Sequence, residues 1–231
     1  MLRTLTIILL FGGYPAFAMS QEHGDGADAK RGMQAFVEAK SYAWTSEEAP
    51  GAGVVPVVAR YEKRKPLYVV ADKLECYRQG NQVAYLGDQG WMRSRTGTLS
   101  DPLRILGSVA KVRSLTMPHE ELTILLGSDL KEKRNSRTKD AKQTKWVFAL
   151  TGDAVRKLVP PQYAQVAQEG EAEVWAQADK LVRYRIEIGL KGTIGNAEID
   201  GKYTHQVNVD AIGRTIVTPP EAAMRQLEPM P

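Results

Sequence analysis

The side chains that could most readily support metal or proton-transfer chemistry are three histidines, His23, His119 and His205, which lie far apart in the sequence. The one compact cluster of candidate ligands is His119 with Glu120 and Glu121. Because consecutive residues on a helix point in different directions, this cluster is a poor chelate. The sequence contains no His-Glu-x-x-His motif and no Gly-x-Ser-x-Gly nucleophile elbow. It therefore predicts a binding protein, not an enzyme, that uses no metal and no cofactor.

Cys76 is the only cysteine. A single cysteine excludes both an intrachain disulfide and a cysteine metal cluster. It stands in a segment where apolar and polar residues alternate, which is typical of a small buried apolar residue rather than of a reactive thiol. The fold is therefore expected to be stabilised by an ordinary apolar core, and 231 residues are enough to build one.

The formal net charge of +4 is concentrated in one segment. Between Gly127 and Lys145 there are seven basic and three acidic residues, a local net charge of +4. No aromatic residue occurs there that could stack on a nucleobase, so nucleic-acid binding is not predicted. We interpret residues 128–145 as a mobile basic loop. Two roles stay open: a solvated loop, or a patch that contacts anionic headgroups or a partner, at ~1 kcal/mol per basic residue near such a surface. The candidates for that contact are Lys131, Lys133, Arg134 and Arg137.

The N-terminus has the pattern of a secretory signal peptide. Arg3 precedes an apolar run, Leu5 to Phe11, and an Ala-x-Ala sequence ends at Ala18. The run is shorter than the ~20 residues of a spanning helix. We therefore predict a signal peptide over residues 1–18 with cleavage after Ala18, a disordered lead-in over 19–28, and a periplasmic or secreted protein with no later transmembrane segment.

Residues 29–228 are predicted to form a single α+β domain. A helix is expected from Asp28 to about Lys40, followed by short alternating strands. Asp101-Pro102 and Pro118 each carry a helix-start signal, so two apolar helices should follow the first strands. The later strands are expected at 146–150, 172–177, 181–190, 203–211 and 215–217, with helices at 152–158 and 221–227; the earlier ones are expected at 42–45, 54–63, 67–77, 82–86 and 91–94.

Three stretches resemble a known family. They are GDQGWMRS (87–94), WVFALTGDAVRKL (146–158) and VNVDAIGRTIVTPPEAAMRQL (207–227). In order and type they are similar to a hairpin, a strand–helix unit and a closing strand of the LolA/LolB-like periplasmic lipoprotein carriers, nearest the LppX/LprG-type lipid-binding branch. That branch is lipid-anchored through a cysteine, and this chain has none at the predicted mature start, so anchoring is not carried over.

The resemblance implies a strongly curved antiparallel sheet, a half-barrel, with short helices covering its concave face. It also implies a cavity between sheet and helices that admits the acyl chains of a lipid or lipoprotein. The residues expected to line it are Trp91, Leu103, Ile105, Leu106, Val109, Leu122, Leu125, Phe148, Trp175, Tyr184, Ile186 and Ile188. The alternative is that these side chains fill the interior and the chain is a non-catalytic module that binds another envelope protein. An exported hydrolase built from dispersed residues is the least supported alternative.

Overall fold

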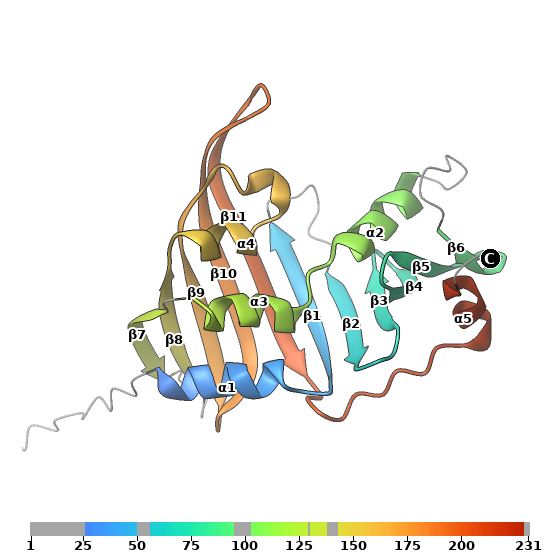
Figure 1. Ribbon diagram of the computed structural model, residues 1–231, viewed down its shortest axis with the longest axis horizontal. Helices are drawn as coiled ribbons and strands as arrows, with labels where there is room; N and C mark the ends of the chain where they lie inside the picture. Colours follow the sequence, from blue (N-terminus) through green and yellow to red (C-terminus); the bar gives the residue numbers. More distant parts are fainter. Residues whose placement is uncertain (1–25, 50–55, 95–102, 129, 138–142, 229–231) are drawn as a thin grey trace, which may run out of the picture.

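The computed structural model describes residues 26–49, 56–94, 103–128, 130–137 and 143–228. The predicted signal peptide and most of the predicted lead-in lie outside these ranges. Eleven strands form one antiparallel sheet in the order β6-β5-β4-β3-β2-β1-β11-β10-β9-β8-β7 (Figure 1). The strands are β1 (Ser41–Ala49), β2 (Val57–Glu62), β3 (Leu67–Ala71), β4 (Leu74–Gln79), β5 (Gln82–Gly87), β6 (Gly90–Arg93), β7 (Lys131–Arg137), β8 (Gln143–Leu150), β9 (Ala167–Gln177), β10 (Lys180–Ile194) and β11 (Ala197–Asp210).

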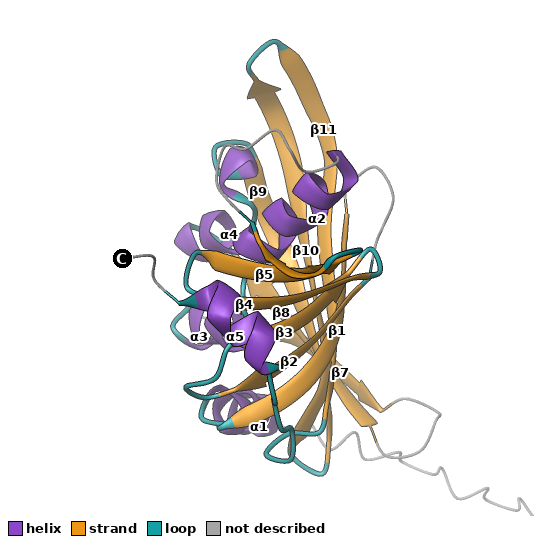
Figure 2. Cartoon of the chain, turned by 90° about the vertical axis from the view of Figure 1, so that its right-hand side faces the viewer, coloured by secondary structure: helices purple, strands orange, loops and turns teal. Residues whose placement is uncertain are grey.

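The strand order shows two meanders that meet in the middle of the sheet. One runs outward from β1 to β6, the other inward from β7 to β11, and β1 pairs with β11 at the junction. The helices are α1 (Ala27–Val37), α2 (Leu103–Ser114), α3 (Pro118–Leu126), α4 (Asp153–Leu158), the 3-10 turn η1 (Pro161–Tyr163) and α5 (Glu221–Leu227). Figure 2 shows the sheet bending around helices on its inner side. This is the predicted α+β half-barrel.

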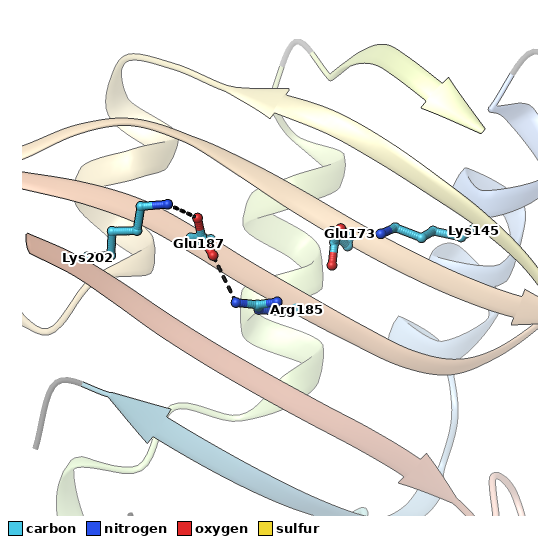
Figure 3. A network of polar contacts seen from close by, with 5 residues as sticks. All are labelled: Lys145, Glu173, Arg185, Glu187 and Lys202. Carbon is cyan, nitrogen blue, oxygen red and sulfur yellow. Dashed lines mark hydrogen bonds and ion pairs between the residues drawn. The ribbon is translucent and has the colours of Figure 1, made fainter. Parts of the chain in front are cut away.

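Alternation along β10 divides the sheet into an apolar concave face and a polar convex face. Tyr184, Ile186 and Ile188 point inward and are fully buried, at 0% exposure. Arg185 and Glu187 point outward, where Arg185 and Lys202 both contact Glu187 at 2.8 and 2.6 Å (Figure 3). Since one face of β10 packs against helices and the other meets solvent, this strand shows a period of two.

The concave face carries the main core. Helix α1 packs against α3 and β10, and Leu122 and Leu125 of α3 are both fully buried. Toward the other edge, α2 packs on β3, β4 and β5, where Cys76 is buried. Burial raises the pKa of the Cys76 thiol to about 12. The prediction that Cys76 is a small core residue is therefore confirmed.

Helix α5 covers the opposite face of β4, β5 and β6. Its Ala223 and Leu227 pack with Tyr77 and Ala84, whose side chains point away from α2. Arg93 holds the C-terminal end of α5 by donating to the carbonyls of Gln226, at 2.5 Å, and of Glu228. The unpaired carbonyls that end a helix are thereby satisfied.

The connection from β11 to α5 corrects one sequence prediction. Residues 215–217 do not form a strand. Thr215 and Val217 are buried while Ile216 is 74% exposed, so the segment alternates as a strand does. The backbone N–H of Val217 donates to the Glu62 carboxylate at 2.8 Å instead of to a neighbouring strand. The Glu62 carboxylate therefore replaces the backbone carbonyl that a paired strand would offer.

A second correction concerns residues 67–77, which were expected to be one strand. They form β3 and β4, joined at Asp72 and Lys73. Both residues have positive φ, 48° and 63°. Two consecutive residues with positive φ are typical of the tight turn of a two-residue hairpin. The sequence lacks glycine at this turn, which is why the break was not predicted.

The third correction concerns the segment expected to be a basic loop, residues 128–145. Residues Lys131–Arg137 form β7, and β8 already begins at Gln143. The charged residues led us to predict a loop. They are compatible with a strand because β7 lies at the edge of the sheet. Charged side chains on an edge strand discourage pairing with another chain, so they are common there.

Candidate functional site

A cavity of 460 Å³ lies over the centre of the sheet, where the two meanders meet. Its floor is the concave face of β1, β2 and β11. Its walls are the end of α2 with the connection to α3 on one side, and the segment from α4 through η1 on the other. The lining residues are Ser46, Glu48, Val57, Lys111, Ser114, Leu115, Thr116, Glu121, Lys157, Leu158, Val159, Pro160, Pro161, Gln162, Tyr163, Tyr203 and His205.

Strand pairing places the polar groups of the floor. Glu48 of β1 lies directly opposite His205 of β11, and Ser46 lies opposite Val207. Tyr203 is two residues before His205, so it projects from the same face. Tyr203 donates a hydrogen bond to Glu48. Two neighbouring strands therefore present an ordered row of polar side chains to the cavity.

Helix α3 brings a carboxylate to this row. Pro118 begins the helix, and Glu120 accepts a hydrogen bond from the backbone N–H of Met117 at 2.9 Å, which caps the first turn. Glu121 then faces the sheet: one carboxylate oxygen accepts from the Tyr184 hydroxyl, and the other contacts Nδ1 of His205 at 2.8 Å. Both of its oxygens are thus engaged by β10 and β11.

The Glu121–His205 pair is buried, with 3% and 6% of each residue exposed. Burial works to lower the pKa of His205, but the charge and hydrogen bond of Glu121 and the charge of Glu48 together raise it above its ordinary value. Lys111 acts in the opposite direction. Burial and the Glu121 charge also hold the pKa of the Tyr184 hydroxyl well above its ordinary value. This hydroxyl therefore stays protonated and donates a hydrogen bond to Glu121.

One arginine fixes the wall formed by α2. Arg78 of β4 donates to the carbonyls of Val112, Arg113 and Leu115 at 2.9, 3.1 and 2.9 Å. These carbonyls lie at the end of α2 and in the connection that lines the cavity. A positive side chain at a helix C-terminus both satisfies its carbonyls and complements its dipole. Arg78 therefore holds the connection in place from the neighbouring sheet.

The opposite wall is stiffened by two prolines. Pro160 and Pro161 follow α4, whose Val155 and Leu158 are buried against the core. The carbonyl of Pro160 accepts from the N–H of Tyr163 at 2.8 Å, which closes the η1 turn. Because proline fixes φ, this wall keeps its shape with little conformational freedom.

Comparison with known proteins gives matches among solved structures. No family model matches the chain, and no curated protein matches it. The structure of LprF from Mycobacterium bovis matches with a TM-score of 0.52 and 10% identity, over 85% of this chain and 96% of the LprF chain. The chain shares the fold of LprF. The predicted likeness to the LppX/LprG-type branch is thus confirmed at the level of the fold.

Two further structures match less closely. The lipoprotein LppX of Mycobacterium tuberculosis has a TM-score of 0.45 and 15% identity, over 83% of this chain and 96% of its own. A LolA superfamily protein from Nitrosomonas europaea has a TM-score of 0.28 and 7% identity, over 84% and 94%.

Within this LprF-like fold, several residues predicted to line a cavity come together in the core. Leu122, Leu125, Phe148, Ile186 and Ile188 are each 0% exposed and belong to one cluster on the concave face. Val109 and Tyr184 are buried in the same cluster, and Ile105 packs against it. None of these residues borders the 460 Å³ cavity. Their contact with a ligand stays a prediction.

The remaining predicted residues lie elsewhere in the LprF-like fold. Trp91 packs beside Tyr77 in the cluster under α5, with ring centroids 5.3 Å apart. Trp175 lies on the convex face, where the Arg183 guanidinium stacks on its ring at 3.9 Å. Leu103 and Leu106 belong to α2, but their side chains lie outside what the structure describes. The same holds for the side chains of three headgroup candidates, Lys133, Arg134 and Arg137, whereas Lys131 is exposed at the start of β7.

The polar residues of the cavity were not predicted as a site. His205 and Glu121 are 84 positions apart in the sequence, and only the packing of α3 on β11 joins them. The available signal was the alternation of Tyr203, His205 and Val207, which places a histidine on the inner face of a strand. Among the described residues, no group of three or more histidine, cysteine, aspartate and glutamate side chains is placed to hold a metal ion. None of the helices in the described ranges has the length and apolar character needed to cross a membrane.

Proposed function

We propose that this chain is an exported, non-catalytic carrier that binds an acyl-chain ligand in the cavity between the helices and the concave face of the sheet. The observation that carries the proposal is the 460 Å³ cavity at the centre of an LprF-like half-barrel. Small-molecule sites typically have volumes of about 300–1,000 Å³. The predicted signal peptide supports export to the periplasm or the medium.

The size of the cavity suits a ligand with one chain. At about 30 Å³ per water-sized group, the cavity holds roughly 15 non-hydrogen atoms. A chain of about ten carbons with a small headgroup has this volume, whereas a lipid with two or three long chains exceeds it. Each buried CH₂ contributes ~0.8 kcal/mol, so ten would supply on the order of 8 kcal/mol before the ordering costs of binding.

The cavity has both surfaces that an amphiphile requires. Val57 on the floor and Leu115, Leu158 and Val159 on the walls give it apolar surface, which would contact the chain. The polar row on β1 and β11 lies on the floor, where a headgroup would find hydrogen-bonding partners. A purely apolar ligand would leave these polar groups without new partners, and burying polar groups without hydrogen bonds is unfavourable.

Cavity filling tests the proposal. Thr116 lines the cavity, so Thr116→Trp should reduce the affinity for a displaceable fluorescent acyl-chain probe with an uncharged headgroup by at least ~10-fold, since a bulky ring would occupy the space. Thr123→Trp is the matched control: Thr123 is exposed on α3 and does not line the cavity, so binding should not change. Thermal melting of both variants verifies that they fold.

Native mass spectrometry of the purified protein gives the second test. Adducts of lipid mass that disappear on organic extraction are the expected result. An adduct-free mass together with no probe binding would refute the carrier proposal. It would favour the alternative in which a filled interior supports binding to another envelope protein.

The basic residues of β7 are proposed to contact anionic headgroups while the ligand transfers. Replacing Lys131, Lys133, Arg134 and Arg137 together by glutamine should weaken sedimentation with vesicles that contain 30 mol% (about one lipid in three) phosphatidylglycerol. Binding of the soluble fluorescent probe should be unaffected. Equal sedimentation of variant and parent would exclude this role.

A further inference from the structure

The interior of the cavity holds equal numbers of acidic and basic side chains. Two carboxylates, Glu48 and Glu121, face two basic groups, Lys111 and His205. Glu121 contacts His205 at 2.8 Å, Glu48 lies opposite His205 in the β1–β11 pairing, and Lys111 lines the same cavity. Lys157 also lines the cavity, but it is exposed and belongs to the rim. The interior therefore has no surplus of positive charge to offer an anion.

The hydrogen bonds of Glu48, Glu121 and His205 point to the same conclusion. Both oxygens of Glu121 are engaged, by Tyr184 and by Nδ1 of His205, and Glu48 accepts from Tyr203. Nε2 is the ring nitrogen of His205 that is not engaged by Glu121. Ser46 adds a buried hydroxyl to the same floor, and a hydroxyl can both donate and accept.

We propose, on the basis of the carrier function above, that the floor formed by Ser46, Glu48, Glu121, Tyr203 and His205 selects an uncharged ligand headgroup that both donates and accepts hydrogen bonds, such as a hydroxyl or an amide, and rejects a carboxylate or a phosphate. A hydroxyl donates to a carboxylate oxygen of the floor and accepts from its donors. It brings no charge into the buried site.

An anionic headgroup would be disfavoured at the same floor. It would be a third negative group beside Glu48 and Glu121, and His205 already has the carboxylate of Glu121 as a partner. Burying a charge without a partner is unfavourable, and like charges placed together are a common means of rejecting a wrong ligand. The preference for an uncharged over an anionic headgroup should therefore come from Glu48 and Glu121. Removing one of these two carboxylates should weaken the preference.

The test compares two ligands that share one chain, 1-decanoylglycerol and sodium decanoate, at pH 7, each used to displace the same fluorescent probe. We expect the parent protein to bind decanoylglycerol at least ~10-fold more tightly than decanoate. In Glu48→Gln this ratio should fall toward one, because decanoate gains affinity when a negative charge is removed. Glu121→Gln should act in the same direction and serves as the second variant.

Glu47→Gln is the matched control. Glu47 precedes Glu48 on β1 and is exposed on the opposite face, so the change in total charge is identical but the ratio should not move. Tighter binding of decanoate by the parent, or an unchanged ratio in both cavity variants, overturns the selection while leaving the carrier function intact. Failure of both ligands to bind, with no lipid adduct in native mass spectra, overturns the carrier function as well.

Discussion

Two regions of the same concave face differ in what occupies the space between the sheet and the segments that cover it. Over β8, β9 and β10, the space beneath α1 and α3 is filled by side chains such as Phe148, Ile186 and Leu122, all at 0% exposure. Over β1, β2 and β11, the space beneath the α2–α3 connection and the α4–η1 segment stays open as the 460 Å³ cavity. The sheet is continuous across both, so the difference comes from the side chains and from what covers them.

The comparison shows what keeps part of a curved sheet open. Branched and aromatic side chains on the filled side interdigitate at the density of a protein interior. On the open side, Glu121 of α3 is hydrogen-bonded to Tyr184 and His205, and Arg78 of β4 is hydrogen-bonded to the end of α2. The wall formed by α2, α3 and their connection therefore cannot move inward without losing these hydrogen bonds. A buried polar group that loses its hydrogen bond destabilises the fold, so these hydrogen bonds keep the geometry rigid.

The strongest effect should come from the filled region. Leu122→Ala removes a fully buried side chain, and such changes cost 2–5 kcal/mol, which we expect to measure as a lower free energy of unfolding in urea. Leu86→Ala is the control, because Leu86 is 41% exposed and should change stability by less than about 0.5 kcal/mol. Similar losses in both variants would mean that Leu122 does not pack in a filled interior.

The next effect concerns the wall of the cavity. Arg78→Met keeps most of the side-chain volume but removes the donor to the carbonyls of Val112, Arg113 and Leu115, which should lower the free energy of unfolding by about 2 kcal/mol. Because the connection loses its attachment, probe binding should weaken even at temperatures where the variant is folded. Arg60→Met provides the comparison, since Arg60 is exposed and should affect neither property. Unchanged probe binding in Arg78→Met would show that the connection holds its position without Arg78.

A smaller effect should appear as a pH dependence of stability. His205 has a raised pKa in the folded protein, so the proton it binds stabilises the fold fully below about pH 6.5, its ordinary value. This stabilisation is lost as pH rises through the folded pKa, and each unit of difference between the two values is worth about 1.4 kcal/mol. Glu121 and Glu48 favour the proton, whereas burial and Lys111 oppose it.

The variant His205→Gln should flatten this alkaline loss, which urea titrations at intervals from pH 5.5 to about 9 would reveal. An equal slope in parent and variant would show that another group titrates. His119 is the internal comparison, because burial lowers its pKa and its contribution has the opposite sign.

Local patterns in the sequence were enough to predict an antiparallel α+β domain, because β10 and the Pro118 helix start each carry a strong periodic or capping signal. The curvature of the half-barrel was predicted from the family resemblance. They failed where a strand lacks apolar alternation, as in β7, and where Asp72 and Lys73 adopt a turn without glycine. The site itself could not be predicted from spacing, since Glu121 and His205 meet only through tertiary packing. The resemblance suggested an apolar cavity, but which parts of the interior are filled depends on how side chains interdigitate, and a single sequence does not encode that in a readable pattern.

The smallest effect should come from the ion pairs of the convex face, and it sharpens the contrast with the cavity. Lys202 contacts Glu187 at 2.6 Å, yet the Lys202 side chain is 68% exposed, so solvent and salt screen the attraction. Lys202→Ala should lower the free energy of unfolding by no more than ~0.5 kcal/mol, and 1 M salt, at which the screening length is about 3 Å, should remove most of this difference. The Glu121–His205 contact should be less sensitive to the same salt, because the two residues are only 3% and 6% exposed. A large, salt-resistant loss in Lys202→Ala would mean that the outer network contributes to the fold as strongly as the inner one, and the distinction between the two faces would then rest on packing alone.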